Sequence, residues 1–115
     1  MSIGADAIRG YVDLMVLSLL RTEPSYAYEL TQRITSISDS NYAIKQTTLY
    51  SAVKRLENSG LVTSYAGISP TGMPRTYYRI TEAGFAHFGL KVKEWQVTKL
   101  VVDKFINEAP EGGTP

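Results

Sequence analysis

Residues 46–60, which read QTTLYSAVKRLENSG, constrain the fold more than any other stretch of this 115-residue chain. The apolar residues of this stretch recur at steps of three and four, which places them in one stripe along a helix. The stripe consists of Leu49, Ala52, Val53 and Leu56. The opposite face carries hydroxyl, amide and cationic side chains, with Glu57 as its only acid. We therefore predict an amphipathic helix that ends at Gly60, where a residue with positive φ is favoured.

The polar face of this predicted helix has two readings. Taken alone, such a face belongs more often to an ordinary surface helix than to a binding site. Hydroxyl, amide and cationic groups also suit phosphate oxygens and base edges, which need donors at short reach. The residues that follow decide between the two.

A β-hairpin is expected directly after Gly60. Residues 61–66 (LVTSYA) and 75–80 (RTYYRI) are rich in strand-forming residues, and the loop between them contains two glycines and two prolines. A series of helices followed by such a hairpin predicts a winged helix-turn-helix. The hairpin is then the wing, and residues 46–60 are the recognition helix.

Two helices are expected before the recognition helix. The first, over Ala7–Arg21, is apolar almost all round and needs more cover than one small domain supplies, which indicates a partner subunit. The second covers Tyr26–Ile37 with Ser25 as its N-cap, after a break at Pro24. Residues 42–44 are expected to form either a short strand or an extended link.

The last expected helix begins at Thr81, its N-cap, and runs to about Asn107. Steps of three and four along it describe a seam typical of paired helices, formed by Phe85, Phe88, Val92, Trp95, Lys99, Val102 and Ile106. The sequence thus predicts a mainly helical protein with a small hairpin. Its parts are a winged helix-turn-helix domain over 7–80, a dimerisation helix over 81–107 and a disordered tail over 108–115.

Positive charge is concentrated around the predicted recognition helix and wing. From Lys45 to Arg79 there are five cations and one acid, so this segment carries 5 − 1 = +4. The net charge of the chain is +1, which leaves 1 − 4 = −3 for the remainder. A local excess of cations on one segment favours contact with nucleic-acid phosphates.

Several function classes are disfavoured. Cysteine is absent, which excludes disulfides and thiolate chemistry, and His87 is the only histidine. No nucleotide-binding glycine motif and no GxSxG motif occurs. We therefore expect no catalytic residue, no metal ligand and no cofactor. The start of the chain lacks a secretory signal, and no apolar run reaches the roughly 18 residues of a membrane span, so a cytoplasmic location without a membrane partner is expected.

Short motifs with a defined order and spacing carry a resemblance to a known family. They are TLY at 48–50, RLE at 55–57, GL at 60–61, YYR at 77–79 and TE-G at 81–84. Together they resemble the PadR family of transcriptional regulators over about residues 8–107. The single long C-terminal helix with Trp95 is similar to the short-chain branch, which includes lactococcal-type multidrug-sensing repressors. The resemblance implies a homodimeric repressor, paired through its first and last helices, with a flat aromatic ligand between the two Trp95 side chains.

The candidate site residues fall into two sets. The DNA-binding candidates are Thr47, Thr48, Tyr50, Ser51, Lys54, Arg55, Thr71 and Arg75. The ligand-binding candidates, which depend on the resemblance, are Leu14, Ser18, Phe88, Val92 and Trp95. Trp95 can alternatively be part of a closed dimer core.

The function expected from these observations is that of a dimeric repressor which binds double-stranded operator DNA and is released by a planar aromatic molecule. The alternative is a winged-helix module that binds another protein, or a DNA-binding subunit that needs no ligand. Catalysis is a distant third possibility.

Overall fold

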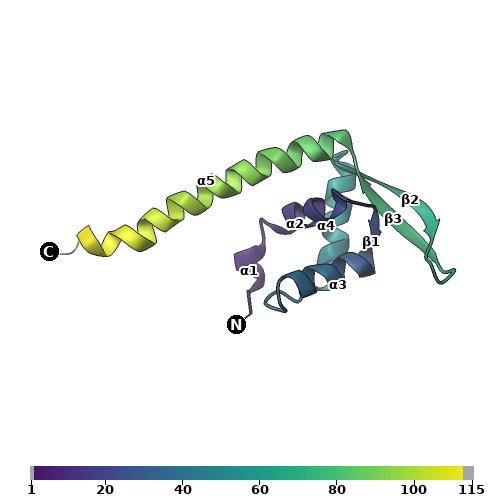
Figure 1. Cartoon of the computed structure of the whole chain (residues 1–115), viewed down its shortest axis with the longest axis horizontal. Helices are drawn as coiled ribbons and strands as arrows, with labels where there is room; N and C mark the ends of the chain where they lie inside the picture. The colour runs from purple at the N-terminus through teal and green to yellow at the C-terminus, as the bar shows by residue number, and fades with distance from the viewer. Residues whose placement is uncertain (1, 113–115) are drawn as a thin grey trace.

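A bundle of short helices and a small sheet enclose the core, and a long helix projects away from both (Figure 1). The computed structural model describes residues 2–112, with side chains over 2–107. The elements in chain order are α1 (Ala5–Ile8), α2 (Val12–Leu20), β1 (Ser25–Tyr26), α3 (Ala27–Ile37), α4 (Gln46–Asn58), β2 (Val62–Ile68), β3 (Pro74–Ile80) and α5 (Glu82–Gly112). The predicted fold class, a mainly helical winged helix-turn-helix with a long C-terminal helix, is confirmed.

Helix α4, the predicted recognition helix, packs one face against the core. Its predicted apolar stripe is buried, because Leu49, Ala52 and Val53 are fully inaccessible to solvent and Leu56 is nearly so. The burial of each of the larger side chains contributes about 1.5–3 kcal/mol to folding. Gly60 has the positive φ that was predicted, at 74°, and the helix itself ends just before it, at Asn58.

The sheet contains a strand that the sequence did not indicate. Its order is β1-β3-β2, with both pairs antiparallel, and Tyr26 of β1 lies opposite Tyr77 of β3. Ser25 belongs to this strand, and no side chain caps α3, so the predicted N-cap at Ser25 was wrong. Residues 42–44 take the other predicted form, an extended link, in which Tyr42 and Ile44 are buried in the core.

The first predicted helix is divided in two. Residues 9–11 separate α1 from α2, so a single helix over Ala7–Arg21 was wrong. Gly10 lies in this break, where a residue that is unfavourable inside helices is tolerated. Most of the apolar side chains of α2 are buried within the domain, and Leu14 and Met15 stay half-buried.

A compact junction joins the recognition helix to the long helix. The hydroxyl of Thr81 accepts a hydrogen bond from the Gly84 amide (3.0 Å), which confirms Thr81 as the cap of α5, and donates one to the Gly60 carbonyl (2.8 Å). The Thr81 amide also donates to the Leu61 carbonyl (3.0 Å). This network fixes the start of α5 against the chain that leaves α4.

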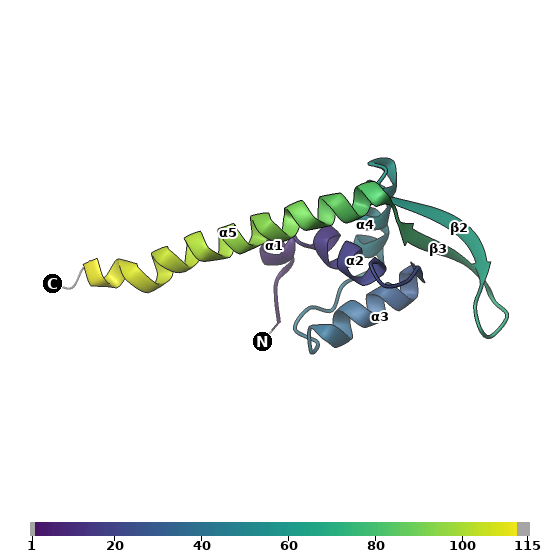
Figure 2. The same ribbon diagram turned by 45° about the horizontal axis from the view of Figure 1, so that its top comes forward.

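Beyond the junction, α5 extends away from the domain (Figures 1 and 2), and the described molecule measures 66 × 31 × 20 Å. The helix continues to Gly112, past the end predicted at Asn107. Residues 108–112 of the predicted disordered tail are therefore helical, and residues 113–115 lie outside the described part. Large apolar side chains remain exposed along the outer half of α5, including Val97, Leu100, Val101, Val102, Phe105 and Ile106.

The junction leads to a first prediction. A Cβ atom at Gly84 would lie 2.2 Å from the Leu61 carbonyl oxygen and 2.6 Å from Cγ1 of Ile80. Because a backbone atom cannot move aside easily, Gly84→Ala should lower the free energy of unfolding by about 1–3 kcal/mol, measured by urea denaturation.

The matched control is Gly89→Ala in the same helix, where an added Cβ meets no described atom within 4 Å. This variant should be at least as stable as the parent, because alanine favours a helix over glycine by about 1 kcal/mol. Both variants must be compared at one protein concentration. Equal stability of Gly84→Ala and the parent would contradict the role given to the junction.

Candidate nucleic-acid interface

The outward face of α4 carries most of the predicted DNA-binding residues. Thr47, Tyr50, Ser51 and Lys54 are exposed on it, and Thr48 is half-buried. The N-cap residue Lys45 has no side-chain cap bond, and the first turn contains no acid. The first amides of the helix are therefore free to meet an anion. This face can offer hydroxyl, phenol, ammonium and backbone donors to a polar ligand.

The only acid of this face is turned toward the wing. Glu57 accepts a hydrogen bond from the Ser64 hydroxyl of β2 (2.6 Å) and lies 3.7 Å from Nζ of Lys54. The Lys54 side chain is 69% exposed, and a surface ion pair of this length contributes little. Lys54 thus remains available to an external anion.

Arg55 is held differently from the other candidates. Its Nη2 donates to Oδ1 of Asp13 at 2.6 Å and its Nε to Oδ2 at 3.3 Å, a bidentate ion pair between α4 and α2. The hydrogen bond to Asp13 raises the pKa of Arg55, and burial opposes that shift. Arg55 thus fastens the recognition helix to α2, a role that the sequence could not indicate because its partner lies 42 residues away.

Cations on the outer face of the sheet lie on aromatic rings. The guanidinium carbon of Arg75 is 4.7 Å from the centre of the Tyr26 ring, and that of Arg79 is 5.0 Å from the Tyr65 ring. Tyr77 joins the two pairs, because it stacks on Tyr65 and meets Tyr26 edge to face, both at 5.6 Å. We call these five residues the aromatic–arginine row.

The tip of the wing is a tight turn. Ser69 is buried, and its hydroxyl accepts a hydrogen bond from the Met73 amide (3.1 Å) and lies 3.0 Å from the Thr71 hydroxyl. Gly72 provides the positive φ, at 87°, that the turn requires. Thr71 is exposed at the tip, so its hydroxyl can still accept a bond from outside while it is engaged with Ser69.

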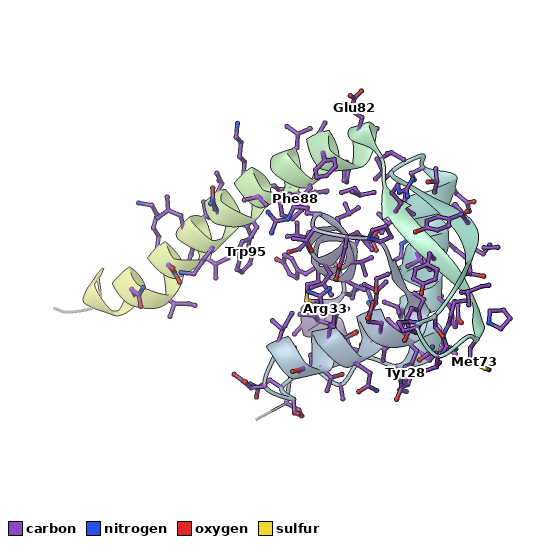
Figure 3. The ribbon with its side chains drawn as sticks, turned by 45° about the vertical axis from the view of Figure 1, so that its right-hand side comes forward. Tyr28, Arg33, Met73, Glu82, Phe88 and Trp95 are labelled. Carbon is purple, nitrogen blue, oxygen red and sulfur yellow. The ribbon has the colours of Figure 1, made fainter. Side chains whose placement is uncertain are left out.

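A cleft of about 240 Å³ separates the wing from the recognition helix. It is lined by Tyr26, Ala27, Tyr28, Gln46, Tyr50, Pro74, Arg75, Thr76 and Tyr78. Figure 3 shows Tyr28 of α3 and Met73 of the wing at the same end of the molecule. Burial, together with the nearby Tyr50 and Glu57, raises the pKa of the Tyr78 phenol above its ordinary value.

Of the residues that line this cleft, only Tyr50 and Arg75 were predicted as site residues from the sequence, and others such as Tyr26, Tyr28 and Gln46 were missed. Tyr28 is 57% exposed and lies outside the buried stripe of α3, which consists of Ala27, Leu30 and Ile34. That Tyr28 borders the cleft depends on the position of β3, for which the local sequence pattern contains no signal.

The predicted ligand-binding residues lie around two separate cavities. Trp95 borders one of about 580 Å³, where it meets Tyr11 edge to face at 5.1 Å. Ser18, Phe88 and Val92 line an apolar groove of about 470 Å³ between α2, α3 and α5. Leu14 borders both, and Figure 3 shows Phe88 and Trp95 at successive positions along α5. A single protomer therefore does not bring all five residues around one ligand.

The described part of the chain contains neither a metal-ligand cluster nor a membrane-spanning helix. No group of three or more histidine, cysteine, aspartate and glutamate residues there could hold a metal ion. None of the helices in that part has both the length and the apolar character needed to cross a membrane.

Comparisons with known proteins agree with this architecture. Residues 16–89 match the model of the transcriptional regulator PadR-like family. A structure of a transcriptional regulator from Clostridium thermocellum is 48% identical, with a TM-score of 0.83 over 91% of this chain and 99% of that one. A PadR family transcription regulator from Clostridium difficile R20291 is 32% identical, with a TM-score of 0.73 over 85% of this chain and 100% of that one.

One further relative supports the same assignment. A protein of Lysinibacillus sphaericus described as uncharacterized protein X is 37% identical over 102 residues, which is 89% of this chain and 94% of that protein. The family match covers most of the chain and includes α4 and the wing. The chain therefore belongs to the PadR-like family of transcriptional regulators, a non-enzymatic family whose members bind DNA.

Proposed function

We propose that this protein is a homodimeric repressor that binds operator DNA through α4 and the wing of each protomer. The observation that carries the proposal is the exposed, donor-rich face of α4, whose only acid is engaged with β2. Thr47, Thr48, Tyr50, Ser51 and Lys54 then face the major groove and its phosphates. Arg75 and Thr71 contact the DNA backbone from the wing. A protein with this role acts where its operator DNA lies, and we propose the cytoplasm.

In this proposal, residues 7–80 bind DNA and α5 pairs the two protomers. The outer half of α5 supports a second copy as its partner, because several large apolar side chains there are exposed, and Phe105 is 73% exposed. Isolated apolar side chains are common on surfaces, but a continuous apolar surface along one helix favours an interface. A dimer would present two recognition helices to half-sites about one DNA turn, roughly 34 Å, apart.

Release by a planar aromatic molecule is the regulatory part of the proposal, in keeping with the multidrug-sensing branch that the sequence resembles. The cavity beside Trp95 is lined by Tyr11 and Leu14 and adjoins the helix proposed to pair two protomers. Trp95 is 40% exposed in one protomer, so its indole face is accessible for stacking. A ligand between two protomers would change the separation of their recognition helices and so reduce DNA affinity.

The first test of this proposal concerns Lys54. The variant Lys54→Ala should bind the DNA upstream of the protein's own gene more weakly than the parent. The slope of log affinity against log salt concentration should also become shallower by about one unit. Fluorescence anisotropy at several salt concentrations measures both. Lys93→Ala, an exposed lysine on α5, is the control and should leave the slope unchanged. If the slope is the same for Lys54→Ala and for the parent, Lys54 does not contact a DNA phosphate.

The second test concerns the dimer. The parent should sediment as two protomers at micromolar concentration, and Ile106→Glu should shift it toward one. Two symmetric isoleucines would lose about 1.5–3 kcal/mol each if both are buried in the pair. The neighbouring Asn107→Glu introduces the same charge at a polar position and should remain dimeric. A parent that sediments as a single protomer would contradict the proposal.

The third test concerns the ligand. Trp95 is the only tryptophan, so quenching of its fluorescence by planar dyes reports on one site. Trp95→Ala should weaken dye binding, followed by dye fluorescence, by roughly 3–10-fold, as expected for the loss of one aromatic contact. Dye that binds should also displace DNA from the parent. If no planar dye quenches Trp95, the aromatic effector is the part of the proposal that fails.

A further inference from the structure

The cleft between α3, α4 and β3 contains a cation but no acid. None of its lining residues is an aspartate or a glutamate, whereas Arg75 contributes a full positive charge. The Nε atom of Arg75 is buried and has no hydrogen-bond partner among the described residues. A buried donor without a partner costs free energy, and a charged one costs more. The cleft thus contains a positive charge that no acidic residue of its lining neutralises.

Tyr26 determines where Arg75 points. The Tyr26 ring lies under the guanidinium group, at 4.7 Å from its carbon atom. This ring is fixed from two sides, since Tyr26 pairs with Tyr77 in the sheet and also meets the Tyr77 ring edge to face. An aromatic face attracts a guanidinium group but does not neutralise it. Arg75 is therefore oriented by the protein and keeps its charge for a ligand.

The cleft is continuous with the outward face of α4. Tyr50 belongs to both, because it is exposed on that face and also lines the cleft. Tyr28 contributes a second phenol from the start of α3, a helix whose first amides have no side-chain cap. A DNA duplex that meets α4 in its major groove would bring one sugar–phosphate strand across this opening.

We propose that this cleft binds one phosphate of the DNA backbone, with Arg75 as the charged donor and Tyr26 as the residue that positions it. Tyr28 and Tyr50 line the same phosphate site with their phenols. The inference rests on the proposed DNA-binding function and extends it to β1 and α3. Arg75, the second residue of β3 after the turn of the wing, thereby contacts DNA from beside the recognition helix.

The first experiment measures DNA binding of tyrosine variants by fluorescence anisotropy, with the DNA upstream of the gene. Tyr26→Leu, which removes the ring, should weaken binding roughly 3–10-fold, the equivalent of one cation–π contact. Tyr26→Phe keeps the ring and should bind like the parent. Because the tyrosine acts through Arg75, the double variant Tyr26→Leu with Arg75→Ala should bind no more weakly than Arg75→Ala alone.

Tyr65→Leu is the matched control for this series. Tyr65 belongs to the same aromatic–arginine row, but it stacks on Tyr77 and holds Arg79, and it does not line the cleft. Its replacement should leave DNA affinity within about twofold of the parent. If Tyr65→Leu weakens binding as much as Tyr26→Leu, the loss comes from a looser sheet, and the positioning role of Tyr26 is wrong.

The second experiment tests the phosphate directly and does not depend on a tyrosine variant. Single phosphates of the duplex are replaced one at a time by neutral methylphosphonates. At one position in each half-site, this replacement should weaken DNA binding by the parent about tenfold. The same replacement should leave the affinity of Arg75→Ala almost unchanged. If every position costs the two proteins the same, Arg75 does not hold a phosphate. If the parent itself binds no DNA, the proposed function fails before this inference is tested.

Discussion

The hydrogen bonds of Thr81 set the geometry on which the rest of the molecule depends. They join the Gly60 carbonyl, at the end of the recognition helix, to the first turn of α5, and Gly84 lets the two segments approach without a side chain between them. Because α5 is a single helix beyond this point, its direction relative to α4 is decided within a few residues. In a symmetric dimer, the spacing of the two recognition helices then follows from this junction and the pairing of α5.

The arginines around the recognition helix are held either by an ion pair or by an aromatic ring. Arg55 is neutralised by Asp13 and serves the packing of α4 on α2. Arg75 and Arg79 instead lie on tyrosine rings, which orient a guanidinium group and leave its charge uncompensated. The segment from Lys45 to Arg79 therefore exposes its charge mainly through Lys45, Lys54 and the wing. A charge count along the sequence does not separate these two kinds of arginine.

The features that could be predicted from the sequence are those with local causes. The stripe of α4, the cap at Thr81 and the positive φ of Gly60 each follow from residues a few positions apart. The two-residue strand β1 exists only because β3 pairs with it some fifty residues later, and it was missed. The first helix is divided at residues 9–11, where Gly10 is a local signal that the prediction of one continuous helix did not use. For the site, the polar face of α4 was predictable, whereas the Arg55–Asp13 pair and the cleft beside Tyr28 arise from tertiary contacts that no local pattern contains.

The position of α2 gives a physical basis for communication between the two ends of the proposed regulator. Asp13 lines the cavity that contains Trp95, and the same carboxylate holds Arg55 of the recognition helix. Buried side chains of α2, such as Val16 and Leu17, share one core with Leu49 and Val53 of α4. A shift of α2 by a molecule in that cavity would therefore act on α4 through a charged contact as well as through the close-packed core. Since packed interiors change between discrete arrangements more easily than they deform, a small displacement beside Trp95 can move the recognition helix as a unit.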